Sequence, residues 1–197
     1  MKKVFFKPVA LVCLLMIATL NVWASSGAET LIRNTTNKVL NALKADKSQA
    51  HRLVENAVLS HFDFERMSKL VLAKNWRRIT DDQKISFANE FRGLLIRTYS
   101  SALVEAAGKV RTIDYSSVNK GGSPPRAMVS SKVYQSGKAM PIEVDYDMYS
   151  HKGQWKVYNV KVGGVSLVNN YRTEFANDIN RMGIEGLINK IKNQNRK

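Results

Sequence analysis

The sequence predicts an α+β fold, in which N-terminal helices and one long helix close a curved, four-stranded antiparallel sheet around an apolar cavity. Three observations lead to this prediction. Apolar residues recur with a helical period over about residues 29–108. The period changes to two over about residues 110–163, where short turns separate the runs. Helical spacing returns over about residues 166–193, and helices followed by a meander of strands are typical of an α+β arrangement.

Residues 1–24 have the features of a cleaved secretory signal peptide, so a single domain is expected over residues 25–197. A lysine-rich start precedes an almost wholly apolar run over residues 9–20. Val22-Trp23-Ala24 then offers small residues at the positions that a signal peptidase reads. A transmembrane anchor is the alternative, because the uncharged stretch is of borderline length for a membrane span.

The cysteine count and the net charge restrict the chemistry of this domain. Cys13 is the one cysteine of the chain and lies inside the predicted signal, so disulfides and thiol chemistry are excluded for the mature part. The chain has 31 basic and 16 acidic residues, a formal net charge of +15. Loss of Lys2, Lys3 and Lys7 would leave +12. This charge predicts attraction to anionic lipid headgroups or acidic partner surfaces, with plain solubility as the alternative.

Capping sequences mark where the first helices begin. Asp46-Lys47-Ser48-Gln49 and Thr80-Asp81-Asp82-Gln83 have the spacing of capping boxes, and Asp63 can cap a helix that follows it. The helix behind Thr80 is expected to end at Gly108, which gives about 27 residues and roughly 40 Å. Its expected buried face carries Phe87, Phe91, Leu94, Leu95, Thr98, Ala102 and Ala106.

The sheet is predicted from four runs that are separated by glycine-containing turns. We expect strands at about residues 110–118, 126–136, 138–149 and 154–163. The third run alternates most clearly, since Met140, Ile142, Val144, Tyr146 and Met148 fall on one face and Glu143, Asp145, Asp147 and Tyr149 on the other. Such alternation is typical of an antiparallel sheet with one wetted face.

Two helices are expected after the sheet, near residues 166–181 and 184–193, with Gly183 between them as a C-cap. Ser166 is placed to cap the first of them. A nucleophilic role for Ser166 is disfavoured, because Gly164-Val165-Ser166-Leu167-Val168 lacks the second glycine of a nucleophile elbow.

Metal and nucleic-acid binding are both disfavoured. His51, His61 and His151 are far apart in the sequence, and none has the spacing of a zinc site. Asn75-Trp76-Arg77-Arg78 combines aromatic and basic residues as single-stranded nucleic-acid binders do, but a secretory signal argues against that partner. A buried helix-terminal tryptophan beside arginines is the expected reading of this run.

Two functions remain open for a cone-shaped pocket. A small enzyme of the isomerase or hydrolase type could use Asp114, Tyr115, Tyr146 or Asn159 for acid–base chemistry. Alternatively, an apolar cavity would suit an extended hydrocarbon ligand, unless large side chains fill the space. The side chains expected to line the cavity are Leu95, Tyr99, Val129, Val133, Ile142, Val144, Tyr146, Met148, Trp155 and Val157.

Three blocks of the sequence carry a family resemblance over roughly residues 31–191. The most specific is residues 154–172, QWKVYNVKVGGVSLVNNYR, with its order Trp-Lys-Val-Tyr, Gly-Val-Ser-Leu and Asn-Tyr-Arg. The other blocks include Asp63, Met67, Val71, Leu72, Trp76, Arg77, Thr80, Gln83, Phe87 and Phe91. Together they resemble the MlaC or toluene-tolerance family of periplasmic phospholipid carriers. Ala73, where the family often has glycine, and Asn159, where aspartate is common, depart from the pattern.

This resemblance implies a periplasmic, monomeric carrier that binds a glycerophospholipid by its acyl chains and shuttles it between the outer and inner membranes, maintaining outer-membrane lipid asymmetry. The implied partners are an outer-membrane lipoprotein–porin complex and an inner-membrane ABC transporter with a lipid-handling ring. The family brings no catalytic residue, metal or cofactor to this chain. The bound phospholipid is the implied ligand.

Overall fold

The computed structural model describes residues 20–45 and 50–196. Most of the predicted signal peptide and the capping box at residues 46–49 lie outside the described residues. The helices are α1 (Leu20–Ala45), α2 (Ala50–His61), α3 (Phe64–Leu72), the 3₁₀-helix η2 (Ala73–Arg77), α4 (Asp81–Ala107) and α5 (Leu167–Asn195). The strands are β1 (Val110–Gly121), β2 (Arg126–Gln135), β3 (Ile142–His151), β4 (Gln154–Val162) and β5 (Val165–Ser166). No described helix has both the length and the apolar character that a bilayer crossing requires.

Within the described residues the strands form one antiparallel sheet in chain order, β1-β2-β3-β4-β5, which confirms the predicted α+β class. The sheet has five strands rather than the predicted four. Gly163 (φ 56°) and Gly164 (φ 80°) reverse the chain after β4, and consecutive positive φ angles suit glycine at a tight hairpin. Val165 consequently pairs with Val162, and a two-residue strand forms that no periodicity could indicate.

The third strand begins later than expected. β3 starts at Ile142 rather than near residue 138, directly after Pro141, whose backbone has no N–H to donate to a neighbouring strand. Met140 was expected in this strand, on the same face as Ile142 and Val144, but it precedes the strand and is 78% exposed. From Ile142 the expected alternation begins, with Glu143 exposed and Met148 fully buried. Tyr149, which was expected on the wetted face, is instead only 5% exposed, because it packs against Asp63 and Arg66 at the start of α3.

The predicted starts of two helices are confirmed by their hydrogen bonds. Gln83 N donates to Thr80 Oγ1 (3.2 Å), and Thr80 N donates to Gln83 Oε1 (3.0 Å), which completes the capping box of α4. Arg66 N donates to Asp63 Oδ1 (2.8 Å) at the start of α3. As predicted, α4 ends at Gly108.

The buried face of α4 differs from the prediction in its second half. Thr98 and Ala102 are exposed, whereas Ile96 and Ser100 are buried. The helix changes neighbours along its length, because its end at Ala107 packs with α1. The residues buried in the second half of α4 therefore lie on a different side of the helix from the one predicted from its first turns.

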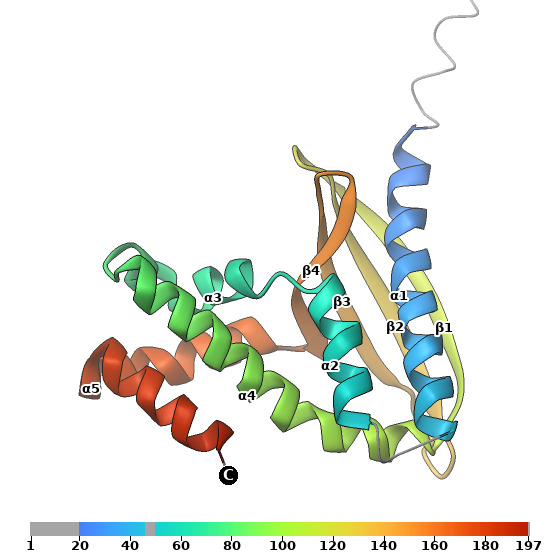
Figure 1. The fold of residues 1–197 in the computed structure, drawn as a ribbon. Coiled ribbons are helices and arrows are strands. Elements are labelled where there is room, and N and C mark those ends of the chain that lie inside the picture. The colour runs from blue at the N-terminus through green and yellow to red at the C-terminus, as the bar shows by residue number, and fades with distance from the viewer. Residues whose placement is uncertain (1–19, 46–49, 197) are drawn as a thin grey trace, which may run out of the picture.

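Helices α3, α4 and α5 enclose a helical core at one side of the molecule (Figure 1). Phe87 and Phe91 of α4 meet the ring of Phe175 edge to face, with centroids 5.8 and 5.9 Å apart. Gly183 (φ 72°) breaks α5 as predicted, so the second arm folds back and Leu187 joins the same core. Across this bend, Lys190 Nζ lies 2.6 Å from the buried carboxylate of Asp178.

Candidate functional site

One face of the sheet is apolar and is covered by α1, which runs alongside β1 and β2 (Figure 1). We call this surface the apolar sheet face and define it by its buried residues, Ala127, Val129, Met148, Val157 and Val160. Tyr115, Val144, Tyr146 and Trp155 are partly buried against it. This cluster shares no buried residue with the helical core, and only the half-buried Phe62 packs against both, so the sheet and the α3–α5 helices have distinct apolar centres. A third, smaller cluster joins α1 to α4 at Leu43 and Ala107.

A β-bulge enlarges the apolar sheet face. Between the pairs Asp147–Asn159 and Met148–Val157 the register shifts by one residue, which leaves Tyr158 as the extra residue of β4. Two side chains three positions apart, Val157 and Val160, are consequently buried in the same cluster. Without the shift, strict alternation would place Asn159 rather than Val160 on the side of Val157.

The covering helix was missed as part of the site by sequence reasoning. Ala28 (fully buried) and Ile32 (4% exposed) insert into the cluster, and Leu31 packs beside them. Their spacing of three and four residues is the signal of one helix face, but the periodicity does not say which surface that face meets. α1 approaches the sheet closely at Gly27, where an added Cβ would lie 3.3 Å from Trp155 Nε1.

The structure brings together six of the ten predicted lining residues: Val129, Val144, Tyr146, Met148, Trp155 and Val157 all belong to or pack against the apolar cluster. Val133 and Ile142 pair with each other further along β2 and β3, where both are half-buried. Leu95 lies in the helical core instead, and Tyr99 packs against that core. Whether these residues contact a ligand is taken up below as a proposal.

Two tyrosine hydroxyls, those of Tyr115 and Tyr146, interrupt the apolar sheet face. Burial, and to a smaller extent the neighbouring Tyr115, raises the pKa of Tyr146 to about 12, while a hydrogen bond with Ser131 opposes the shift. Tyr115 Oη is buried without a hydrogen bond of regular geometry to any described residue, although Thr36 is near enough to lower its pKa. Both tyrosines therefore stay neutral at physiological pH.

The four residues considered for acid–base chemistry do not converge. Tyr115 and Tyr146 lie at the apolar sheet face, whereas Asp114 is exposed. Asn159 alternates to the opposite face and donates to Asp147 Oδ2 (2.9 Å). Ser166 caps α5 as predicted, because Asn169 N donates to its Oγ (3.2 Å).

No metal-binding group of three or more His, Cys, Asp or Glu side chains occurs in the described part of the chain. His61, at the end of α2, is half-buried. Burial, followed by the nearby Lys156 and Lys38, lowers its pKa, so it is neutral at physiological pH.

The fold and the apolar sheet face together define the class: a small α+β protein in which a helix covers the apolar face of a single antiparallel sheet. The family model described as MlaC protein matches residues 33–193. The chain belongs to the MlaC family.

Named relatives agree with this assignment. The toluene tolerance protein ttg2D of Pseudomonas putida is 29% identical over 169 residues, which cover 81% of this chain and 76% of the relative. The intermembrane phospholipid transport system binding protein MlaC of Haemophilus influenzae is 21% identical over 96% of this chain and 92% of its own. A phospholipid-binding protein from Ralstonia solanacearum, solved in complex with a phospholipid, has a TM-score of 0.72 and 26% identity, covering 86% of this chain and 97% of its own.

Proposed function

We propose that this protein is a carrier that holds a phospholipid by its acyl chains between the apolar sheet face and the helices that cover it. The observation that carries the proposal is the separation of the two apolar centres. The helical core already supplies a hydrophobic centre for the fold. The second centre, beneath α1, is a surface that an acyl chain can share with the covering helix.

The relatives support this ligand. The Ralstonia solanacearum protein was solved with a phospholipid bound, and its similarity to this chain extends over most of both structures. The Haemophilus influenzae relative is named for intermembrane phospholipid transport. We propose the same ligand class for this chain, with no cofactor and no catalytic step.

The energetics of lipid transfer explain why an apolar surface suffices. Burying a methylene is worth about 0.8 kcal/mol, so exposing two long acyl chains to water costs on the order of 20 kcal/mol. A protein with an apolar interior replaces one hydrocarbon-like environment with another, and the transfer becomes nearly neutral. Specific polar contacts to the headgroup are then unnecessary for holding the lipid.

Within the proposed site, the fully buried Val129, Met148 and Val157 form the floor that meets the acyl chains. Val144, Tyr146 and Trp155 flank this floor, and we retain Val133 and Ile142 as its extension along the sheet. Leu95 and Tyr99 would reach a ligand only from the α4 side, since they pack at the helical core. The headgroup is proposed to lie toward solvent.

We propose that the carrier works in the periplasm after cleavage of its signal peptide and shuttles lipid between the outer and inner membranes. Its proposed docking partners are an outer-membrane lipoprotein–porin complex and an inner-membrane ABC transporter with a lipid-handling ring. The family membership supports this pathway.

Solvent extraction of the purified mature protein, followed by mass spectrometry, tests the proposal. We expect about one two-chain phospholipid per protein molecule. A lipid-free protein that also takes up no lipid from phospholipid vesicles would contradict the proposed function.

A further inference from the structure

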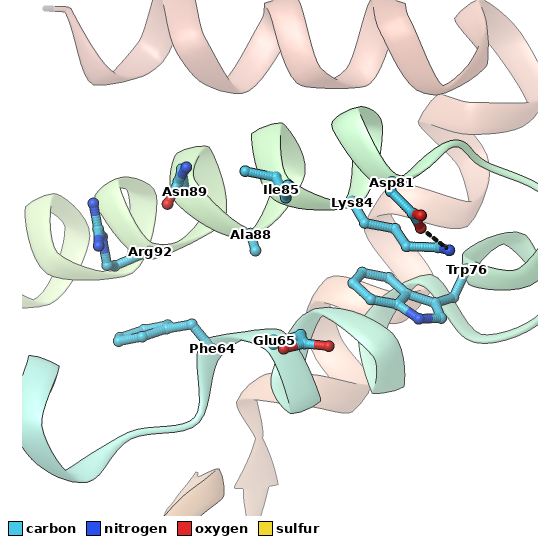
Figure 2. Close-up of a pocket in the computed structure, with 9 residues that line it drawn as sticks. All are labelled: Phe64, Glu65, Trp76, Asp81, Lys84, Ile85, Ala88, Asn89 and Arg92. Carbon is cyan, nitrogen blue, oxygen red and sulfur yellow. Dashed lines mark hydrogen bonds and ion pairs between the residues drawn. The ribbon is translucent and has the colours of Figure 1, made fainter.

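A groove of about 440 Å³ lies between α3 and α4, away from the apolar sheet face. Figure 2 shows Phe64 and Trp76 on one side of it, facing Ile85 and Ala88 of α4. We call it the α3–α4 groove. None of its lining residues belongs to the buried cluster of the sheet, so a ligand of this groove would be independent of one held beneath α1.

The groove is left open by a small side chain. Ile85, Ala88 and Arg92 follow one another at helical spacing along a single stripe of α4. Ala88 stands where a larger residue would fill the space between Phe64 and Trp76. Ile85 is 61% exposed at the groove, although neighbouring turns of α4 bury Phe87 and Phe91 completely. The helical core therefore does not account for the apolar side chain of Ile85.

Two basic and two acidic side chains line the groove, and Arg77 and Arg78 add positive charge beside it. Arg92 at its rim makes no ion pair with any described residue. Arg77 and Arg78, next to Trp76, are exposed and likewise unpaired within the described part of the chain. Of the acidic groups at the rim, Asp81 is paired with Lys84 (2.8 Å), which leaves Glu65 as the one unpaired carboxylate among the lining residues.

We infer that the α3–α4 groove is a docking site for an acidic segment of a protein partner. The segment inserts an apolar side chain between Phe64 and Trp76, covers Ile85, and places carboxylates near Arg92, Arg77 and Arg78. The inference depends on the proposed carrier function in one respect only, namely that the docked partner takes part in lipid transfer. Complementary charge favours this acidic partner over other proteins, and the apolar side chain in the groove fixes where the segment lies along α4.

Site-specific photocrosslinking in the host cell tests this inference with the full chain. A photoreactive amino acid replaces Ile85, and the crosslinked peptides are sequenced by mass spectrometry. The matched control places the same amino acid at Met140, which is 78% exposed in the connection between β2 and β3 and does not line the groove. We expect Ile85 alone to crosslink a partner peptide that combines an apolar residue with flanking Asp or Glu.

Several results would overturn the inference. These are the absence of a protein crosslink at Ile85, the same peptides from Met140, or a crosslinked peptide without acidic residues. A crosslink to a second copy of this chain, or to phospholipid, would equally assign the groove to a different occupant.

Two variants connect the crosslink to the groove itself. Ala88→Phe fills the groove and Arg92→Glu reverses its rim charge, so each should lower the crosslinking yield by about tenfold, as loss of an interface hot spot does. Arg92→Lys keeps the charge and should retain most of the yield. Undiminished crosslinking in both Ala88→Phe and Arg92→Glu would contradict the inference.

Lipid content and melting temperature are measured on the same proteins. We expect both to match the wild type in Arg92→Glu, because the groove is separate from the apolar sheet face. A wild-type protein that crosslinks as expected but contains no lipid would count against the carrier function while leaving the docking site intact.

Discussion

Asn159 Oδ1 accepts a hydrogen bond from Ser166 Oγ (2.9 Å) and thereby joins β4 to the first turn of α5. The same oxygen accepts from Val168 N (3.3 Å), while the Asn159 amide donates to Asp147. Asn159 is only 7% exposed. The buried side-chain amide of Asn159 therefore forms hydrogen bonds with Asp147 of β3, with Ser166 just before α5 and with Val168 in the first turn of α5.

Replacing Asn159 by alanine should destabilise the protein by about 2–3 kcal/mol, because it leaves several buried polar groups unpaired. Chemical denaturation with unchanged m-value would measure the loss. Asn169→Ala, at an exposed position of the same helix start, is the control and should cost less than about 0.5 kcal/mol. Equal effects at both positions would show that the Asn159 network contributes nothing specific.

Ala73→Gly should stabilise the protein. Ala73 ends α3 with a φ of 48°, a region that costs a non-glycine residue of order 1–3 kcal/mol. After the larger entropy loss of glycine on folding is deducted, a net gain of about 1 kcal/mol is expected. The resemblance to the family, in which glycine often follows this leucine, points to the same substitution. Ala102→Gly, exposed inside α4, is the contrasting control and should lower stability by about 0.5–1 kcal/mol.

Val144→Trp should displace bound lipid if the apolar sheet face is the ligand site. Val144 packs beside the buried cluster, so the larger ring would occupy space that we assign to an acyl chain. Asp145→Trp, on the opposite face of β3, should leave the lipid content unchanged. A densely packed face without a ligand would respond differently, since overpacking costs about 1–3 kcal/mol. Retained lipid with a lowered melting temperature would therefore argue against this site.

Tyr146 should make the protein less stable at high pH. Its pKa is raised to about 12 in the fold, so between about pH 10 and 12 the unfolded chain loses this proton while the folded chain keeps it. Stability must fall as pH rises through that window, by up to about 1.4 kcal/mol per pH unit from this group. Denaturation of the wild type and of Tyr146→Phe at pH 9 and pH 11.5 isolates the effect. A phenylalanine variant that declines as steeply as the wild type would refute the assignment.

The net charge should control association with membrane partners. A formal +12 on the mature domain predicts attraction to acidic surfaces. The Debye length falls from about 30 Å at 0.01 M salt to about 8 Å at 0.15 M, so association with the proposed inner-membrane transporter should slow markedly over that range. Stopped-flow or surface-based binding kinetics would measure the association rate constant at each salt concentration. An on-rate that does not change with salt would reduce the charge to a solubility feature.

Local sequence signals determined most elements of this protein and their order, with the short β5 as the exception. The capping box at Thr80, the cap at Asp63 and the break at Gly183 each depend on contacts within a few residues, so their positions could be predicted. The alternation of β3 likewise placed Val144, Tyr146 and Met148 on one face. These predictions succeeded because each rests on backbone geometry that neighbouring residues set by themselves.

Contacts between distant segments were decided by the tertiary structure alone. Periodicity marks the apolar face of a helix but not its partner, so neither the docking of Ala28 and Ile32 on the sheet nor the place of Leu95 in the helical core could be foreseen. The bulge at Tyr158 and the short β5 depend on pairing across strands. The α3–α4 groove exists because Ala88 happens to face Phe64 and Trp76, residues that only the packing of two helices brings together.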